Sequence, residues 1–486
     1  MLLGELAAAA GLTVAEGARR LPVAGVSADS RAVGTGYLFA ALAGSAADGV
    51  RYAGDAVAKG AVAVLASRYA VLDLPGHIAV LRADDPRHAL ALIAAAYYPR
   101  QPARLVAVTG TAGKTSVAVF ARQIFAAAGK EAASLGTIGV VSRQRSEYGS
   151  LTTPDPVALH AELDRLVGEG VTHAALEASS HGLDQHRLDG LRLQAAGFTN
   201  LGRDHMDYHP TVEAYLAAKL RLFKEILPPD GTAVIDMDGA HAAAVLVAAK
   251  ARRQTLIRIG RTGTELRLRE LVPDGFAQRM RVNAFGRERE ILLPLAGTFQ
   301  ASNALVAAGL AIGAGIDVHT ALDALAGLEG APGRLELVGS KANGALVFVD
   351  YAHKPDALAS ALAALRPMTA GRLFVVFGAG GDRDPGKRPI MGQVAADHAD
   401  VVVVTDDNPR SEDPAVIRQA VMQGAPEALE IGDRGKAIAT AVGMLEAGDV
   451  LCVAGKGHET GQIVGGRTVH FSDHEAVRRA LSEEAA

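Results

Sequence analysis

Residues 105–115, with the sequence LVAVTGTAGKT, constrain what this chain can fold into more than any other stretch. The apolar residues 105–108 predict a buried strand, and the periodicity of residues 114–128 predicts a helix that Gly129 ends. The glycines between them allow backbone N–H groups to approach an anion, which the helix dipole also favours. The stretch therefore predicts a strand, a phosphate-binding loop and a helix of an α/β domain.

The predicted loop has the short T-G-T-x-G-K-T form, because Val108 stands where the strict pattern requires a glycine. Lys114 is expected to neutralise the outer phosphates of a nucleotide, and the Thr115 hydroxyl is expected to bind Mg²⁺. An ordinary glycine turn is the alternative, but packing alone does not explain Gly-Lys-Thr at the start of a helix. The residues predicted to bind the nucleotide are Gly110, Thr111, Ala112, Gly113, Lys114, Thr115 and Ser116.

At the usual ~150 residues per domain, a chain of 486 residues is long enough for about three domains. Hydrophobic residues make up 49% and charged residues 21%, so packed cores are expected and disorder is not. Proline and glycine breaks at residues 99–102 and 330–334 separate the parts. We predict domains at residues 1–101, 102–331 and 332–486.

Composition excludes several classes of protein. A net charge of −4 gives no sign of a nucleic-acid partner. No apolar run approaches the ~18 residues of a membrane span, and the first residues lack the basic start of a signal peptide. The lone Cys452 lies in an apolar run, where a core residue is a better interpretation than a nucleophile, and no disulfide framework is possible. The sequence therefore predicts a cytoplasmic location.

Polar residues follow the predicted strand at residues 173–176. Glu177 lies at its carboxyl end, where a chain with a phosphate loop is expected to place a Mg²⁺ ligand; a solvated loop carboxylate is the alternative. His205 and His209 are four residues apart, as zinc ligands often are. The sequence around them lacks H-E-x-x-H or paired cysteines, so structural zinc is not expected.

Beyond these clusters, residues 213–227 predict a helix that contains Lys219, which taken alone would be a surface lysine. Residues 233–295 show short strands with charged alternation and predict an antiparallel or edge region. Residues 297–303 then open an alanine-rich helix.

The last third of the chain has the clearest pattern. Near-continuous apolar strands separated by helices predict a doubly wound parallel sheet. Ligands bind such sheets beyond the carboxyl ends of the strands, so the polar loops after these strands should face one crevice. Residues 378–381 are too loose for a dinucleotide fingerprint, so no redox cofactor is expected. The predicted strands are residues 346–349, 373–377, 401–404 and 450–454.

Taken together, the motifs of this chain resemble those of the Mur ligases of bacterial peptidoglycan synthesis, over essentially the whole length and in the same order. The matching motifs are TGTAGKTS, EASSHGLDQHR, TNLGRDHMDYH, YLAAK, GTFQASN, PGRLE, VDYAHKPDAL, GAGGDRDPGKRP, TDDNPR and AGKGHE. Ala112 departs from the family, which usually has Asn there. The resemblance implies a small N-terminal α/β domain, a central P-loop ATPase-type domain with a mostly parallel sheet, and a Rossmann-like C-terminal domain.

The resemblance is to the family members that add meso-diaminopimelate to UDP-N-acetylmuramoyl-L-alanyl-D-glutamate. It implies that ATP phosphorylates the glutamate carboxylate to an acyl phosphate, which the amine of the incoming amino acid attacks. This chemistry needs charge neutralisation and positioning more than a nucleophilic side chain. The N-terminal domain would bind the UDP substrate, the central domain ATP and the C-terminal domain the amino acid. We expect a monomer.

The resemblance also assigns the metal and nucleotide residues. Thr115 and Glu177 would hold one Mg²⁺. Lys219 matches a lysine that carries a carbamate, which would turn a cation into an anion able to hold a second Mg²⁺. His205 matches a residue near the metals and phosphates, and acts with Lys114 and Lys219 in catalysis. The residues that match the adenosine contacts are Asn303, Arg334 and Asp350.

Two further sets match the substrates. The UDP-muramoyl-dipeptide contacts are Ala28, Ser30, Ser45, Ala46, Ala47, Thr152, Thr153, Ser179, Gln185 and Arg187, although Ser45 and Ala46 replace more polar residues of some relatives. The diaminopimelate contacts are Arg383, Asp407, Asn408, Pro409, Arg410, Gly455 and Glu459. Arg410 is suited to grip the second carboxylate bidentately, and Glu459 would meet the distal ammonium.

Two other functions remain as alternatives. A folylpolyglutamate-type synthetase also joins a carboxylate to an amino acid with ATP, but it is not expected to carry the N-terminal uridine domain or the DNPR motif. A nucleotide-dependent switch or binding module would make little use of polar loops converging on one crevice. Guanine-specific switches use an N-K-x-D element, which this sequence lacks.

Overall fold

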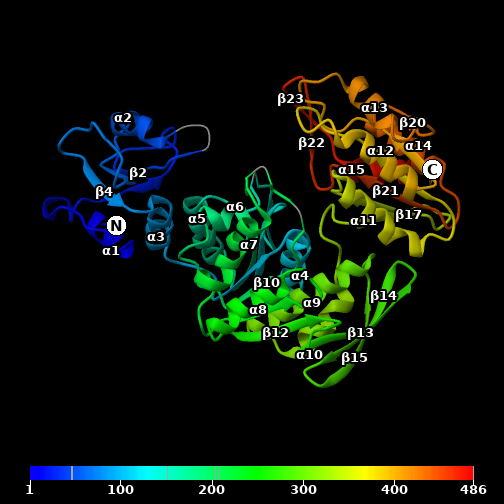
Figure 1. Cartoon of the computed structure of the whole chain (residues 1–486), viewed down its shortest axis with the longest axis horizontal. Helices are drawn as coiled ribbons and strands as arrows, with labels where there is room; N and C mark the ends of the chain where they lie inside the picture. The colour runs from blue at the N-terminus through cyan, green and yellow to red at the C-terminus, as the bar shows by residue number, and fades with distance from the viewer. Residues whose placement is uncertain (45–47, 150, 203, 207, 485–486) are drawn as a thin grey trace. The chain divides into compact units, whose positions relative to one another are not determined.

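In the computed structural model the chain forms two compact units. Figure 1 shows its helices and strands, coloured along the chain. The residues it describes are 1–44, 48–149, 151–202, 204–206 and 208–484. Unit 1 comprises Met1–Arg267 and Leu305–Ala321, and unit 2 comprises Leu268–Ala304 and Leu322–Ala486. The predicted substrate residues Ser45, Ala46 and Ala47 lie outside the described residues.

A small parallel sheet with strand order β1-β2-β3-β4 begins unit 1. Its elements are α1 (Leu3–Ala9), β1 (Gly25–Ser27), β2 (Tyr37–Ala41), α2 (Ala53–Ala58), β3 (Ala63–Ser67), β4 (Ala79–Ala83) and α3 (Pro86–Tyr97). Apolar residues of α1 and α3, including Leu6 and Ile93, cover one face, and Ala56 of α2 packs on the other. The predicted N-terminal α/β domain is confirmed.

The central sheet of unit 1 has the order β12-β11-β10-β5-β9-β6-β7-β8. Its strands are parallel from β12 to β6 and antiparallel from β6 to β8. The elements up to β10 are β5 (Arg104–Thr109), α4 (Lys114–Ala127), β6 (Ala132–Gly136), β7 (Gly139–Ser142), β8 (Ser146–Glu147), α5 (Pro156–Gly168), β9 (His173–Glu177), α6 (Ser180–Asp184) and β10 (Ala195–Phe198). The mostly parallel sheet is as predicted, with β5 and α4 within one residue of the expected bounds.

Helices cover both faces of this sheet. One face carries α5, α6, α7 (Val212–Arg221) and α8 (Ala242–Ala251), whose apolar side chains pack over Ala107 and Phe198. On the other face α9 (Thr298–Gly313) approaches so closely that a Cβ at Gly309 would lie 2.6 Å from Val234. After α7 the chain makes a π-helical turn, Leu222–Ile226, which ends the predicted helix of residues 213–227.

The prediction for residues 233–295 is wrong in its first part. Here β11 (Thr232–Asp236) and β12 (Thr255–Gly260) are parallel strands of the central sheet, joined by α8. This helix, AAAVLVAAKA, is apolar on nearly all sides, so it shows little of the periodicity that reveals a surface helix. The antiparallel prediction holds for β14 (Ala277–Ala284) and β15 (Arg287–Leu293), which follow β13 (Leu266–Asp274).

In unit 2 a second large sheet has the order β16-β17-β21-β18-β19-β20, parallel except for β16 at one edge. Its strands are β16 (Glu336–Ser340), β17 (Leu346–Asp350), β18 (Leu373–Phe377), β19 (Val401–Val404), β20 (Leu429–Glu430) and β21 (Val450–Ala454). Its helices are α11 (Pro355–Leu365), α12 (Lys387–His398), α13 (Pro414–Met422), α14 (Arg434–Gly443) and α15 (Asp473–Glu483). A hairpin of β22 (Gly461–Val464) and β23 (Arg467–His470) lies outside this sheet.

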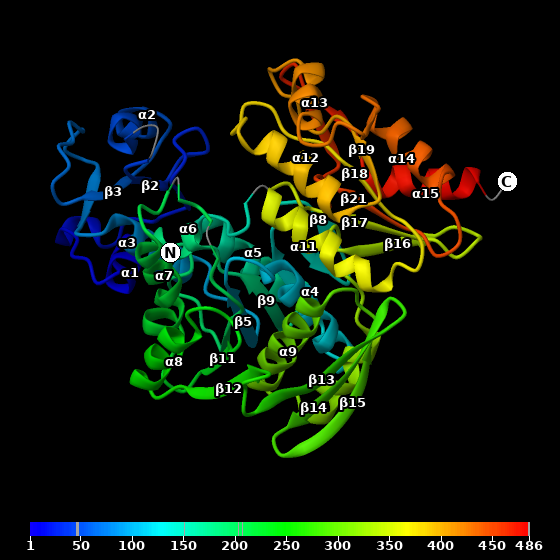
Figure 2. The same ribbon diagram turned by 45° about the vertical axis from the view of Figure 1, so that its right-hand side comes forward.

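The two faces of this sheet have separate cores. Helices α11, α12 and α13 pack with Phe348, Val375 and Cys452, whereas α14 and α15 pack with Phe374 and Val453. Figure 2 shows α11 and α12 on one side of β17, β18 and β21, with α14 and α15 on the other. The predicted doubly wound sheet is confirmed, and burial raises the pKa of the Cys452 thiol well above its usual value, as a core residue requires.

Among the described residues, no helix is both long and apolar enough to cross a membrane.

A buried ion pair fixes α14 to the sheet. Arg434 and Asp473 both have fully buried side chains, with Nε and Nη2 donating to the carboxylate at 2.7 and 2.8 Å. Arg434 Nη2 also donates to the Ala454 carbonyl at 2.9 Å, at the end of β21. Removing one partner would leave an uncompensated buried charge, which is strongly destabilising.

We predict that Arg434→Met lowers the free energy of unfolding by about 3–5 kcal/mol, and that adding Asp473→Leu recovers most of the loss. Urea denaturation of the single and double variants measures both effects. Arg19→Met is the control, because its partner Glu16 and Arg19 itself are exposed and such pairs contribute little. A single Arg434→Met variant as stable as the control would contradict this account.

Candidate active site

The phosphate loop lies between β5 and α4. Gly113, the residue before α4, has a φ of 88°, in the left-handed region that favours glycine. Gly110 has a φ of 151°, and a Cβ there would overlap the Thr199 hydroxyl. Lys114 Nζ donates to the carbonyls of Gly110 and Thr111 at 2.9 and 3.0 Å. The Lys114 side chain thus folds back onto the backbone of the phosphate loop.

Two oxygen donors meet beside the loop. Thr115, at the start of α4, donates its hydroxyl to Glu177 Oε2 at 3.1 Å, and Glu177 ends the neighbouring strand β9. The Thr137 backbone N–H donates to Glu177 Oε1 at 2.7 Å, so both carboxylate oxygens have fixed directions. Hydroxyl and carboxylate oxygens are the ligands that Mg²⁺ prefers, so this pair fits such an ion.

Lys219 is not a surface residue. Its side chain is 1% exposed, and its Nζ donates to the Gly110 carbonyl at 2.8 Å, the same carbonyl that Lys114 contacts. The amine also lies 4.3 Å from the centre of the Tyr215 ring. Burial, with the charge of Lys114 as a second cause, holds the pKa of Lys219 well below its ordinary value. A neutral amine is the form that reacts with CO₂ to give a carbamate.

Ala112 is held by backbone contacts. Its N–H donates to Asn200 Oδ1 at 3.0 Å, and its carbonyl accepts from the Thr199 hydroxyl at 2.7 Å. Both partners follow β10, the strand beside β5. The loop conformation therefore does not depend on a polar side chain at position 112.

His205 has a φ of 55°, an uncommon conformation for a residue other than glycine. Its ring centre lies 4.8 Å from that of His181, in α6. Among the described residues, the group of three or more His, Cys, Asp or Glu side chains close enough to share a metal ion is His88, His186 and Asp189, and neither His205 nor His209 belongs to that group.

The predicted dipeptide contacts of the central domain lie around α6. The Thr137 and Thr152 hydroxyls are 3.0 Å apart, and Thr153 Oγ1 donates to the Glu177 carbonyl at 2.8 Å. Ser179 donates its N–H to Thr153 Oγ1 at 3.0 Å. Arg187 Nη1 reaches the Thr153 carbonyl at 2.7 Å, and its Nη2 donates to Gln185 Oε1 at 2.8 Å. These residues form one connected network with the Glu177 strand.

The described residues of the N-terminal prediction follow β1. Ala28 is exposed, and the Ser30 carbonyl accepts from Lys59 Nζ at 2.9 Å. At the carboxyl ends of β2 and β3 lies a pocket of about 600 Å³ whose lining includes Ala43, Asp48 and Arg87 and neither Ala28 nor Ser30.

The predicted adenosine residues come together within unit 2. Asn303 Nδ2 donates to Gln300 Oε1 at 2.9 Å, and Gln300 Nε2 donates to the Arg334 carbonyl at 3.2 Å. Asp350 Oδ2 accepts from the Leu335 N–H at 2.6 Å, and burial raises the pKa of this carboxyl group. The Arg334 guanidinium lies over the Tyr351 ring at 4.7 Å. A flat aromatic and cationic surface of this kind suits a planar base.

The predicted amino-acid residues surround the loop after β19. Arg410 has a φ of 54°, and its Nη1 donates to the Gly381 carbonyl at 2.7 Å, which brings together the loops after β18 and β19. Pro409 precedes it and is buried. Asn408 Nδ2 donates to Glu459 Oε2 at 3.1 Å, in the loop after β21. Arg383 follows Asp382 in the same loop. Hydrogen bonds from Ser411 lower the pKa of the Asp382 carboxyl, and the charges of Arg410 and Arg383 lower it further.

Asp407 and Gly455 meet on the inner side of these loops. A Cβ at Gly455, whose φ is 118°, would lie 2.6 Å from Asp407 Oδ2, so only glycine fits here. Lys387, at the start of α12, donates to the His353 carbonyl at 3.0 Å and carries a cation near Asp407. The loops after β17, β18, β19 and β21 are thus connected at the carboxyl edge of the sheet, where the strand pattern predicts four polar loops.

Sequence reasoning missed several residues at these sites. Lys456 is fully buried and donates to Asn408 Oδ1 and Glu459 Oε2 at 3.2 and 3.3 Å. The Thr137 N–H donates to the Glu177 carboxylate, and Asn200 accepts from the Ala112 N–H. Lys456 and Asn200 lie within motifs already noted, AGKGHE and TNLGRDHMDYH, so their positions were available. Nothing in the pattern around Thr137 marks it.

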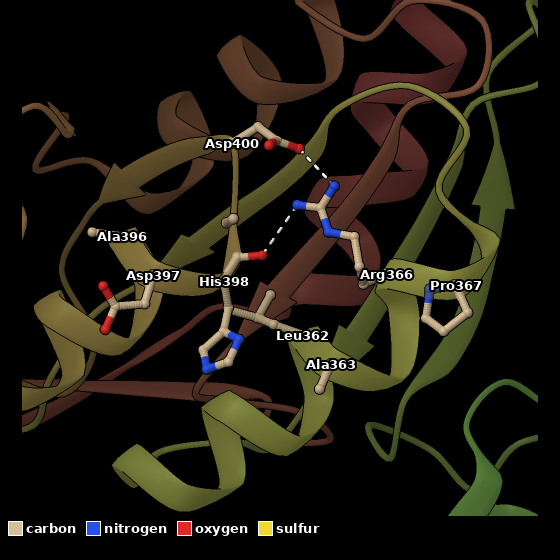
Figure 3. A pocket seen from close by; sticks show the side chains of 9 residues that line it. Leu362, Ala363, Arg366, Pro367, Ala396, Asp397, His398 and Asp400 are labelled. Atoms are coloured by element: carbon tan, nitrogen blue, oxygen red, sulfur yellow. Dashed lines mark hydrogen bonds and ion pairs between the residues drawn. The ribbon is translucent and has the colours of Figure 1, made fainter.

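A second pocket, of about 510 Å³, lies in unit 2 between the ends of α11 and α12 (Figure 3). Figure 3 shows Arg366 bridging to Asp400 and to the His398 carbonyl. Its Nη1 donates to Asp400 Oδ2 at 2.9 Å, and its Nη2 donates to the His398 carbonyl at 3.1 Å. Asp400 precedes β19, so this pocket lies at the amino ends of the strands. Ligands of such sheets bind at the other end, and the polar groups here satisfy one another.

Comparison with known families matches three parts of the chain. They are described as the Mur ligase family catalytic domain (residues 22–98), the Mur ligase middle domain (108–311) and the Mur ligase glutamate ligase domain (333–457). A UDP-N-acetylmuramoyl-L-alanyl-D-glutamate–2,6-diaminopimelate ligase of Mesorhizobium japonicum is 61% identical over 96% of both chains. The enzyme of the same name from Caulobacter vibrioides is 53% identical over 94% of this chain and 95% of its own.

Solved structures give the same picture. A structure of a UDP-N-acetylmuramoyl-L-alanyl-D-glutamate–2,6-diaminopimelate ligase is similar with a TM-score of 0.75 and 33% identity, covering 100% of both chains. A folylpolyglutamate synthase of Mycobacterium tuberculosis has a TM-score of 0.61 at 20% identity, covering 76% of this chain and 92% of its own. At that identity the second likeness shows the fold alone.

The depressed pKa of Lys219 has a consequence for stability. Between that lowered pKa and the ordinary value of 10.5, the unfolded chain binds a proton that the folded chain does not. Stability therefore rises with pH in this window, by up to about 1.4 kcal/mol per pH unit for one proton. We predict that Lys219→Met, with similar volume and no titration, flattens this rise.

Unfolding free energies in CO₂-free buffer between pH 7 and 9, for the parent and Lys219→Met, measure the difference. Lys224→Met is the control, since Lys224 is an exposed lysine of the same segment. Parallel pH curves for the parent and Lys219→Met would show that Lys219 is charged when folded.

Proposed function

The chain belongs to the Mur ligase family, and we propose that it joins meso-diaminopimelate to UDP-N-acetylmuramoyl-L-alanyl-D-glutamate in an ATP-dependent step of peptidoglycan precursor synthesis. The observation that carries this function is the gathering of Lys114, Lys219 and the Thr115–Glu177 pair around one phosphate loop. The names of the most similar curated relatives supply the substrates.

The reaction proceeds in two transfers. The γ-phosphoryl group of ATP moves to the glutamate carboxylate oxygen, giving an acyl phosphate and ADP. The amine of diaminopimelate then attacks the acyl carbon and loses a proton, and inorganic phosphate leaves as the amide forms. Lys114 offsets charge on the phosphates, and the backbone N–H groups at the start of α4 bind them.

Mg²⁺ neutralises phosphate charge and aligns the transferred group when it is bound. Thr115 and Glu177 would hold one ion, because their oxygens already lie 3.1 Å apart with the carboxylate oriented by Thr137. A carbamate on Lys219 would supply an anion at Gly110, where the unmodified amine is a buried base. His205, whose ring centre lies 6.2 Å from that of Tyr215, would contribute a polar side chain to this part of the site.

The C-terminal loops select the amino acid. Arg410 is held by the Gly381 carbonyl and can grip the distal carboxylate of diaminopimelate, whereas Glu459 meets the distal ammonium. Lys456 and Asn408 orient Glu459 through two hydrogen bonds to Oε2. Asn303, Arg334 and Asp350 bind the adenosine part of ATP.

We also propose the three-domain division at residues 1–101, 102–331 and 332–486, with the N-terminal domain binding the uridine part of the substrate. We further propose that the protein acts as a monomer in the cytoplasm. A folylpolyglutamate-type synthetase is disfavoured, because the match to that fold covers 76% of this chain while a Mur ligase description matches residues 22–98.

Phosphate release tests the function directly. The protein should release phosphate from ATP when both UDP-N-acetylmuramoyl-L-alanyl-D-glutamate and diaminopimelate are present, and far more slowly when either is omitted. Mass spectrometry should detect the UDP-linked tripeptide. Release with a folate substrate and glutamate instead would contradict the proposal.

Carbamylation of Lys219 predicts a specific rescue. Lys219→Ala should lose ligation by at least about 100-fold, since one preorganised charge contact commonly contributes ~3 kcal/mol to the transition state. Short carboxylates such as acetate, added at millimolar concentration, should restore part of the activity by replacing the carbamate. Lys224→Ala, treated in the same way, should keep full activity and show no response. An active Lys219→Ala enzyme would contradict the assignment.

Arg410 predicts the amino-acid preference. With lysine in place of diaminopimelate, Arg410 would lack its anion, and a lost buried charge pair costs roughly 2–5 kcal/mol. We predict at least ~30-fold higher kcat/KM for meso-diaminopimelate than for lysine, and loss of most of this preference in Arg410→Ala. The KM for ATP should change little. Arg479→Ala, an exposed arginine of α15, is the control. A parent enzyme that uses both amino acids equally would refute the idea.

A further inference from the structure

A cluster of charged and imidazole side chains joins three parts of unit 1. We call it the imidazole cluster: Asp85 and His88 at the start of α3, His186 and Asp189 after α6, and Arg221 at the end of α7. Helix α3 belongs to the N-terminal sheet and packs against α5 of the central sheet (Figure 1). The cluster is therefore a polar link between the two sheets of this unit.

Asp189 is the centre of the cluster. Its side chain is 6% exposed, and one oxygen, Oδ2, lies 2.6 Å from Nδ1 of both His88 and His186. Arg221 Nη2 approaches the same carboxylate at 3.3 Å. Burial pushes the pKa of Asp189 upward, but the hydrogen bonds from His186 and His88 and the charge of Arg221 leave it below its usual value. The carboxylate is thus a charged acceptor for donors from three elements.

The distances within this cluster fit hydrogen bonds better than they fit metal coordination. Ligands that share Zn²⁺ at ~2.0–2.1 Å lie about 3 Å or more apart, whereas these nitrogen and oxygen atoms are at hydrogen-bond distance. Arg221 also places a permanent cation 3.0 Å from His186 Nδ1. His186 Nε2 lies 3.0 Å from Asp85 Oδ2, so the imidazole lies between two carboxylates, Asp85 and Asp189.

The cluster holds the chain that carries two predicted substrate contacts. His186 stands between Gln185 and Arg187 and has a φ of 58°, a conformation that costs energy outside glycine. Arg221 Nη1 donates to the Leu183 carbonyl, and Arg221 follows Lys219 by two positions on α7. One side chain therefore connects the turn after α6 to the helix that presents Lys219 to the phosphate loop.

We propose that the imidazole cluster is a positioning site for the UDP-muramoyl-dipeptide: it fixes the turn of Gln185 and Arg187 relative to the N-terminal domain and to α7. This inference rests on the proposed function, which places the uridine on the N-terminal domain and the dipeptide near Arg187. The cluster residues need not touch the substrate. Without these contacts Arg187 adopts a wider range of positions in the free protein. Restricting that range when the substrate binds then costs free energy.

The test compares variants of His88, whose side chain is 48% exposed and whose loss should be tolerated by the fold. His88→Leu removes the contact to Asp189. His88→Asn retains it, because the Asn side-chain nitrogen lies near the place of Nδ1. His77→Leu is the matched control, since His77 is an exposed histidine of the same domain. Asp189→Asn keeps the shape of the centre and removes its charge.

We expect His88→Leu and Asp189→Asn to raise the KM for the UDP-dipeptide roughly 3- to 30-fold, with the KM for ATP within about twofold of the parent. His88→Asn should recover most of the loss. The His88→Leu/Asp189→Asn double variant should be no worse than Asp189→Asn, because both act through one contact. Calorimetric titration of the UDP-dipeptide, without ATP, should give the same order of Kd values; the chain has no Trp to report binding by fluorescence.

Several results would overturn the inference. Equal rises in the KM for ATP and for the UDP-dipeptide would show a general structural role. Values for His88→Leu equal to those of His77→Leu would show no role. Stoichiometric Zn²⁺ binding that His88→Leu abolishes would make the cluster a metal site. A parent enzyme that binds the UDP-dipeptide but does not ligate refutes the proposed function alone, since the calorimetric comparison still decides the role of the cluster.

Discussion

The carbonyl oxygen of Gly110 accepts hydrogen bonds from two lysines, Lys114 at 2.9 Å and Lys219 at 2.8 Å. Two amines on one acceptor are tolerable only if one of them is uncharged or later modified, because like charges in a buried site repel strongly. The chain meets this constraint by burying Lys219 beneath Tyr215, which lowers the pKa of the amine. The loop, α7 and the end of β9 are arranged around that contact.

In both large sheets of this protein, the site residues lie on or next to the loops at one edge of the sheet. Parallel strands bring their carboxyl ends to the same edge, and the loops that leave that edge can gather residues from distant parts of the sequence. In the central sheet the residues after β5 meet the ends of two neighbouring strands: Thr115 contacts Glu177 at the end of β9, and Ala112 contacts Asn200 after β10. In the C-terminal sheet the loops after β18, β19 and β21 are connected through Arg410, Asn408 and Lys456. Helices on both faces keep these strands rigid.

Buried charges mark the places where this arrangement is fixed most firmly. Arg434 and Asp473 tie α14 and α15 to the end of β21, and Asp189 joins α3, the turn after α6, and α7. Each such group loses hydration on folding, so its partners must be held in place to compensate. The same requirement gives the sites their preorganised geometry, since the residues next to these charges cannot move freely.

The sequence by itself determined the strands, because an apolar run between polar loops is a local pattern: β18, β19 and β21 have the predicted bounds, and β5 and α4 differ by one residue. It also determined the phosphate loop, whose glycines and Lys114 are contiguous. It did not determine β11 and β12, since the apolar α8 between them hides its periodicity. Nor could it place Lys219, His88 and Asp189, because burial and hydrogen bonds between residues about 100 positions apart exist only after the sheets are packed. Local pattern decided which elements form, and the tertiary structure decided which charges meet.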